Sequence, residues 1–263
     1  ITVNAAPAVQ FTAVPNICFD AIPYQITQAT ETGNVPGTFT YFGPGVSSSG
    51  LFTPSIAGAG IHTIKYLYTS ATGGCKDSAT QTIKVWERAI DDFTVTTNPV
   101  CEKQAVTFTN SSTSTEGTIT QWKWNFADGT PVQVNTSPAP FTHIFNTYGP
   151  FNVKLNVVTN NGCMSADKIV PVTVNPLARP SFTFPAISCL PNANVQFTNQ
   201  STVPNSASST LSYLWNFGDP GSGAVNNSTL TDPAHVYVNL GPYNVKLEVT
   251  TAQGCIHDTT IVL

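Results

Sequence analysis

The spacing of six cysteines constrains the fold of this chain more than any other feature of its sequence. The cysteines are Cys18, Cys75, Cys101, Cys163, Cys189 and Cys255. The separations between neighbours alternate between long ones, of 57, 62 and 66 residues, and short ones of 26 residues. This alternation indicates three copies of one unit with a period of about 88 residues, the size of a small sandwich domain rather than of a solenoid turn. Each copy carries one cysteine near its start and another near its end.

The residues around the cysteines repeat as well. A Phe-Thr segment precedes the first cysteine of each copy, and the second cysteine always follows glycine. Two longer segments match between the second and third copies: VTFTNSS with VQFTNQS, and GPFNVKLNVVT with GPYNVKLEVTT. We therefore predict three domains, at residues 1–88, 89–176 and 177–263. Residues 1–4 resemble the end of a preceding repeat.

The repeat favours one disulfide pattern among the 15 that six cysteines allow, with each copy closing its own bond. The predicted pairs are Cys18–Cys75, Cys101–Cys163 and Cys189–Cys255. Each bond would close a loop of about 60 residues and stabilise the chain by about 4 kcal/mol in the chain-entropy model. The alternative is three pairs of free buried thiols in a cytosolic protein. Disulfides imply an oxidising compartment, so we expect a secreted protein, extracellular or at the cell surface.

Most segments alternate between apolar and polar residues with a period of two. In YNVKLEVTT, Tyr243, Val245, Leu247 and Val249 face one way, and the polar residues between them face the other. Such short strands, separated by turns, predict an all-β chain: a tandem array of three Ig-like antiparallel β-sandwiches. The linkers near residues 87–91 and 176–180 are short, which favours an elongated rod over loosely joined domains.

Composition excludes two classes of partner. Charged residues make up 9% of the chain and its net charge is -4, whereas binding a nucleic-acid backbone needs a basic face. No apolar run approaches the roughly 18 residues of a membrane span, so we expect no membrane insertion.

An aspartate follows an aromatic run in two copies, as WKWNFADGTP and YLWNFGDPGSG. Large aromatic residues at a period of two are typical of a core strand, although a ligand platform has the same pattern. The following Ala-Asp-Gly and Gly-Asp-Pro segments are typical of turns, in which aspartate caps its own backbone and glycine supplies a positive φ. A calcium loop would need several oxygen ligands close together, and here each aspartate stands alone.

Three spaced motifs resemble the polycystic kidney disease (PKD) domain, an Ig-like sandwich. They are WNFGDP, His235-Val-Tyr237 and GPYNVKLEV in the third copy, and WNFADG, His143-Ile-Phe145 and GPFNVKLNV in the second. The resemblance covers roughly residues 89–263 and implies a structural role for the motif residues. These residues are Trp124, Phe126, Asp128, His143, Trp215, Phe217, Asp219, His235 and Tyr237. The first copy has neither the tryptophan turn nor the His-x-Tyr element. It resembles a divergent Ig-like module found beside PKD repeats in long surface proteins of gliding, type IX-secreting bacteria.

Candidates for chemistry are few. The sequence has no HExxH or GxSxG motif, and a lone histidine at a strand edge is usually a structural hydrogen-bonding group. We therefore predict no catalytic residues and no enzymatic activity. Glu87, Asp91 and Asp92 form a weak candidate for a calcium site at the first domain junction, and a solvated linker is the alternative. No other cofactor is expected.

Two functions fit these features. The first is a non-catalytic structural or adhesive segment, a stalk or adhesin repeat of a large bacterial protein, whose partners are neighbouring repeats of the same chain. The second is a carbohydrate-binding accessory module of a secreted polysaccharide- or protein-degrading enzyme, with a polysaccharide or cell-surface ligand. The second function needs exposed aromatic residues, for which Trp86, Trp122 and Tyr41 are the candidates.

Overall fold

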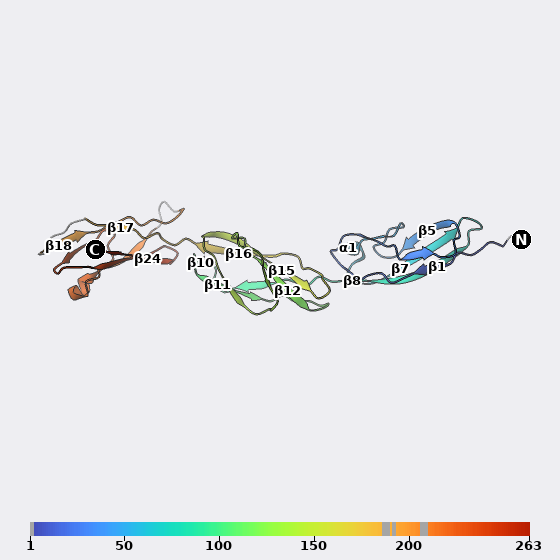
Figure 1. The fold of residues 1–263 in the computed structure, drawn as a ribbon, viewed down its shortest axis with the longest axis horizontal. Helices are drawn as coiled ribbons and strands as arrows, with labels where there is room; N and C mark the ends of the chain where they lie inside the picture. Colours follow the sequence, from blue (N-terminus) through green and yellow to red (C-terminus); the bar gives the residue numbers. More distant parts are fainter. Residues whose placement is uncertain (1–2, 186–189, 191–192, 206–209) are drawn as a thin grey trace.

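The computed structural model describes residues 3–185, 190, 193–205 and 210–263. Figure 1 shows three β-rich units that follow one another along a single line, with the N-terminus at the far end of the first. Each unit buries its own hydrophobic cluster. The prediction of an all-β tandem array of Ig-like sandwiches is therefore confirmed. Within the described residues, no helix has the length and apolar character needed to cross a membrane.

The first unit is built around a four-stranded sheet in the order β2-β8-β7-β5. The pairs β1-β4 and β3-β6 and one short helix complete it. Its elements are β1 (Val9–Phe11), β2 (Ile17–Cys18), β3 (Tyr24–Gln25), β4 (Ala29–Glu31), β5 (Gly37–Phe42), β6 (Leu51–Phe52), α1 (Pro54–Ala57), β7 (Gly60–Ser70) and β8 (Lys76–Trp86).

The second unit packs a five-stranded sheet, β10-β16-β15-β12-β13, against a three-stranded one, β14-β11-β9. Its strands are β9 (Phe93–Val95), β10 (Val100–Cys101), β11 (Ala105–Asn110), β12 (Ile119–Asn125), β13 (Gln133–Asn135), β14 (Phe141–Ile144), β15 (Gly149–Thr159) and β16 (Lys168–Asn175).

The third unit has a four-stranded sheet, β21-β20-β23-β24, and the strand pairs β17-β19 and β18-β22. Its elements are β17 (Phe182–Thr183), β18 (Ala193–Gln196), β19 (Thr198–Asn199), β20 (Ser212–Asn216), η1 (Pro220–Asn226), β21 (Asn227–Ser228), β22 (Ala234–Tyr237), β23 (Asn244–Thr250) and β24 (Ile256–Val262).

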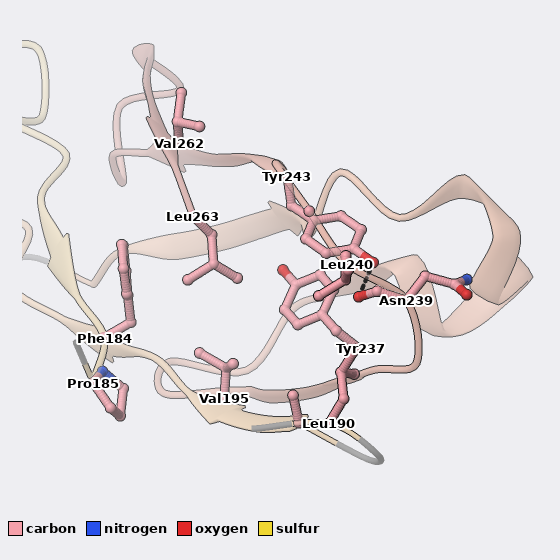
Figure 2. Close-up of a pocket in the computed structure, with 12 residues that line it drawn as sticks. Phe184, Pro185, Leu190, Val195, Tyr237, Asn239, Leu240, Tyr243, Val262 and Leu263 are labelled. Atoms are coloured by element: carbon pink, nitrogen blue, oxygen red, sulfur yellow. Dashed lines mark hydrogen bonds between the residues drawn. The ribbon is translucent and has the colours of Figure 1, made fainter. Parts of the chain in front are cut away.

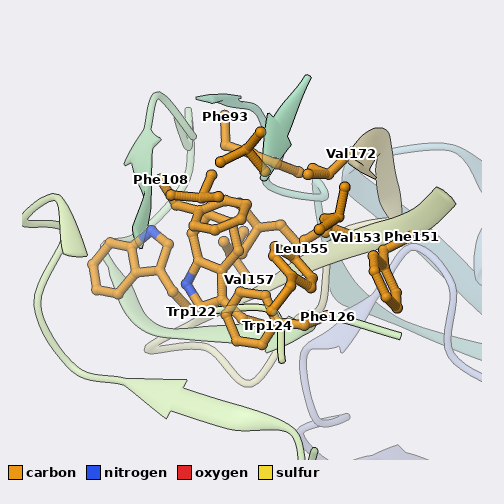
Figure 3. Packing of buried hydrophobic residues seen from close by; sticks show 14 of the residues in the cluster. Phe93, Phe108, Trp122, Trp124, Phe126, Phe151, Val153, Leu155, Val157 and Val172 are labelled. Carbon is orange, nitrogen blue, oxygen red and sulfur yellow. The ribbon is translucent and has the colours of Figure 1, made fainter. Parts of the chain in front are cut away.

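The apolar residues that occupy every second position of the strands face the cores. On β23, Val245, Leu247 and Val249 are fully buried, as predicted. In the second unit, Trp122 and Trp124 of β12 point into the space between the two sheets, where Phe93 and Phe108 meet them (Figure 3). The aromatic run of that strand is therefore core, because its inward face is covered by the opposite sheet.

Two strand pairs depart from the antiparallel pattern. The short strand β2 pairs parallel to the end of β8, with Cys18 opposite Trp86. In the second unit, β10 pairs parallel to the end of β16, with Cys101 opposite Asn175. In these two units the first cysteine therefore lies beside the last residue of the unit's last strand, next to the linker. We call this end of each unit its C-terminal pole and the opposite end its N-terminal pole.

Candidate functional site: the junctions between repeats

The two cysteines of one repeat lie at opposite poles. Cys75 lies in the turn that precedes β8, whereas Cys18 lies beside the far end of the same strand. Strand β8 has 11 residues, so its ends are about 33 Å apart at about 3.3 Å per residue. A disulfide requires Cα atoms within about 7 Å of each other. A bond between Cys18 and Cys75 is therefore impossible in the folded unit.

The predicted pairing is wrong, because the disulfides join neighbouring units. Cys18 is bonded to Cys163, with Cα atoms 5.4 Å apart, and Cys101 is bonded to Cys255, with Cα atoms 5.6 Å apart. In both bonds the first cysteine of one unit meets the second cysteine of the next. Cys75 carries a free thiol in the part of the chain that the structure describes. The sixth cysteine, Cys189, lies outside the described residues.

Stacking of the units explains this pairing. The C-terminal pole of one unit meets the N-terminal pole of the next, where the hairpin turn with the second cysteine lies. The linker itself is anchored from both sides, since Ala89 and Ala178 each sit in the core of the unit that follows. Each junction is thus held by a short linker and a covalent cross-link together.

At the first junction, a loop of the second unit holds the end of β8. The Glu116 carboxylate forms an ion pair with Lys84 and accepts a 2.8 Å hydrogen bond from the Glu87 N–H. These contacts, the Lys84 hydrogen bond first, lower the pKa of Glu116. The Glu87 carboxylate accepts a 2.7 Å hydrogen bond from the Thr115 hydroxyl. Both acids therefore connect the two units.

At the second junction, a buried carboxylate of the preceding unit holds the linker. The Glu102 side chain is 2% exposed and accepts a 2.7 Å hydrogen bond from the Leu177 N–H. The Arg179 guanidinium donates to both Glu102 oxygens at 3.1 and 3.2 Å. Leu177 packs with the cross-linked Cys101 and Cys255 in a small apolar cluster. This junction combines a disulfide, an apolar contact and an ion pair between a buried carboxylate and a partly exposed arginine.

The three carboxylates considered for calcium have separate partners. Asp91 accepts a hydrogen bond from the Lys168 N–H, and Asp92 forms a 2.8 Å ion pair with the Lys168 ammonium. Glu87 is engaged by Thr115. No group of three potential metal-ligating side chains comes together within the described ranges of the chain. The structure therefore does not assemble Glu87, Asp91 and Asp92 into one site.

The Asp-His pair of the second unit is a structural clamp on the aromatic core. His143 lies 2.7 Å from the Asp128 carboxylate and stacks on Phe126 with ring centroids 3.6 Å apart. Asp128 also accepts the Thr130 N–H at 3.0 Å, which is the predicted turn chemistry. Burial acts to raise the pKa of Asp128, but the hydrogen bonds from Thr130 and His143 outweigh it and hold that pKa below its usual range.

The third unit repeats the clamp with one change. His235 lies 3.1 Å from the Asp219 carboxylate and stacks on Phe217. The Asp219 side chain does not cap its own backbone as predicted; the Asn226 side chain accepts the Asp219 N–H instead, at 2.7 Å. The Tyr237 hydroxyl donates to the Phe217 carbonyl at 2.9 Å. Burial, with the charge of Asp219, raises the pKa of Tyr237 well above its usual value.

The aromatic residues considered for sugar binding are mostly unavailable. Tyr41 is 5% exposed and Trp122 is 6% exposed, and both belong to core clusters. Trp86 is half-buried, and the Lys84 ammonium lies 5.0 Å from the centroid of its ring. Of the three candidates, only Trp86 retains accessible ring surface.

A pocket of about 280 Å³ lies in the third unit (Figure 2). Tyr237 and Tyr243 form one wall, and Leu263 and Val195 face them. Both tyrosine hydroxyls already donate to backbone carbonyls, of Phe217 and of Asn239. The other described lining residues are mainly apolar, with Asn239 at the rim, so the described wall lacks a set of convergent polar groups that would orient a small-molecule ligand.

Sequence reasoning missed the residues that hold the junctions together. Glu102, Glu116 and Arg179 have no local pattern, because each acts on a partner in another unit. The shifted disulfide pairing had a usable signal. The second cysteine comes shortly before the last strand of its repeat. The first cysteine comes early in the repeat, before its second core strand. The length of the hairpin that ends in the last strand therefore places the two cysteines far apart.

The fold and the junctions define the chain as a tandem array of Ig-like β-sandwiches with cross-linked joints. The family model described as PKD domain matches residues 90–174 and 178–262, together well over half of the chain. The chain belongs to the PKD domain family. PKD domains and disulfides are typical of extracellular proteins.

Solved structures with similar folds include several multi-domain arrays. The eight N-terminal Ig domains of Down Syndrome Cell Adhesion Molecule share 11% identity over 98% of this chain and 36% of that one, with a TM-score of 0.46. Titin domains I67–I69 share 13% identity over 98% of each chain, with a TM-score of 0.36. Carbohydrate-binding modules of the β-sandwich superfamily share 14% identity over 62% of this chain and 83% of that one, with a TM-score of 0.32.

Proposed function

We propose that this chain is a non-catalytic, extracellular structural segment: a stiff stalk of adhesin-type repeats in a large bacterial cell-surface or secreted protein. Gliding, type IX-secreting bacteria are the source that the first repeat suggests. The observation that carries the proposal is the covalent cross-link at both junctions. A stalk must keep its length and direction, so its junctions must resist bending. Both junctions of this chain are closed by disulfide bonds in addition to surface contacts.

The distribution of the connections supports this role. Each junction has a linker anchored in the following core, a disulfide on the poles and one acidic side chain that bonds a linker N–H. A single linker would act as a hinge. Separate attachments beside the linker oppose rotation about it, so the units keep one orientation relative to each other.

The histidines and acids of the PKD motifs support a non-catalytic role. His235 is 4% exposed and Asp219 is 7% exposed. His143 and His235 are each stacked on a core phenylalanine and bonded to an aspartate. Side chains that are held in this way stabilise the turn and do not meet a substrate.

Small-angle X-ray scattering of the full chain tests the proposal. The longest strands of the first two units have 11 residues and span about 33 Å. Three units of about that length, plus linkers, give a rod of about 110 Å with a radius of gyration of about 32 Å. A compact globule of 263 residues would have a radius of gyration of about 18 Å. We expect the rod value with oxidised disulfides and a broader, more bent ensemble after reduction. A compact or equally flexible oxidised protein would contradict the proposal.

The carbohydrate-binding alternative is tested on the same sample. Its remaining aromatic candidate is Trp86, because Tyr41 and Trp122 are buried. Saturable binding to a polysaccharide that is lost in Trp86→Ala, with the scattering profile unchanged, would support that alternative. The matched control is Phe42→Ala, which removes a half-exposed aromatic residue that pairs with Lys65 near the middle of the first unit's sheet.

A further inference from the structure

The turn that carries Cys75 is built like the two turns whose cysteines are cross-linked. In each, a residue at the end of the preceding strand (Ser70, Thr159 or Thr251) donates its N–H to the carbonyl of the cysteine, which lies five residues further on at Cys75 and four residues further on in the other two turns. These hydrogen bonds measure 2.8 Å at Cys75 and 2.9 Å at Cys163 and at Cys255. The turn therefore presents Cys75 at the N-terminal pole of the first unit, as the other two turns present theirs.

The three cysteines differ in what covers them. Cys163 and Cys255 are 1% and 0% exposed, because the preceding unit sits on their pole and contributes the bonded cysteine. Cys75 is partly exposed and carries a free thiol among the described residues. The Cys75 turn is one residue longer but makes the same hydrogen bond, and no other unit covers its cysteine among the described residues.

A second observation comes from the segment that leads into the first unit. Residues 1–11 align without a gap with residues 83–93 and 172–182, which contain the two linkers. Pro7 is buried at the position of Ala89 and Ala178, the residues that anchor those linkers. Phe11 is buried at the position of Phe93 and Phe182. The segment therefore enters the first unit as a linker does.

The backbone contacts of this segment also match those of the linkers. The Ala8 carbonyl accepts the Thr32 N–H at 2.7 Å, as the Ile90 carbonyl accepts the Thr113 N–H at 2.8 Å. The Asn4 side chain lies so close to Gly73, two residues before Cys75, that a Cβ at Gly73 would come within 2.1 Å of the Asn4 amide nitrogen. The segment that leads into the first unit thus passes beside the turn that carries Cys75.

We propose that Cys75 is the attachment point for one further PKD-type repeat stacked on the N-terminal pole of the first unit. The partner supplies a cysteine from its C-terminal pole, at the position that Cys18 and Cys101 occupy in this chain. The two thiols form one S–S bond and lose two protons and two electrons. A disulfide of a thiol–disulfide oxidoreductase, or glutathione disulfide, accepts them and is reduced to two thiols.

This inference extends the proposed stalk and concerns a third junction. Its test adds a repeat to the full chain. A copy of residues 90–171 is placed directly before Ile1, so that residues 1–3 complete its last strand in the register of β16. In the added copy Cys163→Ser removes the thiol that would have no partner, and the copy's Cys101 is left to meet Cys75.

The readout is peptide mapping without reduction, after refolding in a glutathione redox buffer and alkylation of free thiols. We expect a cross-linked peptide that joins the added Cys101 to Cys75, as abundant as the peptide that joins Cys18 to Cys163. Alkylation of Cys75 should fall from nearly complete in the original chain to the level of Cys163. In the control, Cys101→Ser in the added copy restores alkylation of Cys75.

A second extension guards against an added unit that fails to fold. A copy of residues 178–262 with Cys255→Ser precedes Ile1 and brings the first cysteine of the third repeat in its sequence. If Cys75 stays alkylated in both extended chains while Cys18–Cys163 is closed, the inference is overturned. That result leaves the proposed function standing, since scattering from the original chain tests the rod independently.

Discussion

The buried Glu102 carboxylate allows a quantitative test of how the second junction is held. Its bond to the Leu177 N–H is short, at 2.7 Å, and buried, and a hydrogen bond to a charged group contributes about 1.5–3 kcal/mol. Its ion pair with Arg179 is weaker, because the arginine side chain is 43% exposed and solvent screening reduces such pairs to about 0–1 kcal/mol. The backbone hydrogen bond should therefore dominate.

We expect Glu102→Ala to lower the free energy of local opening at the linker by about 2–3 kcal/mol, and Arg179→Met by at most about 1 kcal/mol. Hydrogen–deuterium exchange of the Leu177 amide measures this opening directly. The expected acceleration is about 30- to 150-fold for Glu102→Ala and less than about 5-fold for Arg179→Met. Glu102→Gln keeps one acceptor oxygen and should fall between the two.

Closure of Cys101–Cys255 must be verified in each variant, because the disulfide adjoins Glu102 and would obscure the comparison if it were open. Exchange at a core amide of β23, such as that of Leu247, serves as the internal control and should not change. Equal effects of Glu102→Ala and Arg179→Met would refute the reasoning, since they would make the exposed ion pair the dominant contact.

Three further predictions concern the PKD motifs. Ala127 has φ of 57°, a left-handed conformation, so Ala127→Gly should raise the free energy of unfolding by about 0.5–1 kcal/mol in denaturant titration; a loss would contradict the assigned strain. The depressed pKa of Asp128 contributes stability that is present above about pH 4 and lost as pH falls through the lowered native pKa. The stability difference between wild type and Asp128→Asn should therefore shrink below about pH 4, and a pH-independent difference in acid titration would count against it. The Trp215 indole donates to the Leu230 carbonyl at 2.9 Å, whereas that of Trp124 has no partner among the described residues, so Trp215→Phe should cost about 1–3 kcal/mol more than Trp124→Phe in thermal unfolding.

Much of the fold follows from local pattern. The period of two on β23 identified Val245, Leu247 and Val249 as core residues, because a strand places alternate side chains on opposite faces whatever its neighbours are. The aromatic run that includes Trp124 was recognised as core for the same reason. The cysteine spacing revealed the repeat, since a repeat in sequence needs no knowledge of contacts.

Local pattern could not decide how completely each residue on a core-facing strand face is covered. Tyr41 and Phe39 are two residues apart and lie on the same face of β5, yet Tyr41 is 5% exposed and Phe39 is 50% exposed. Tyr41 is covered by Phe11 of β1, with ring centroids 6.2 Å apart, and by the loop at Gly50. The sequence alone made Tyr41 a candidate for a binding face, and packing placed it in the core.

The sequence by itself determined that this chain consists of β-sandwich repeats, which strand faces form their cores, and that each repeat carries two cysteines. Only the tertiary structure decided which cysteines bond and that Glu102 and Glu116 hold the joints. The physical reason is distance. Periodicity and turn chemistry act over a few residues and are written in the local sequence, whereas a disulfide or a buried carboxylate selects the partner that stacking of separate units brings within a few ångströms.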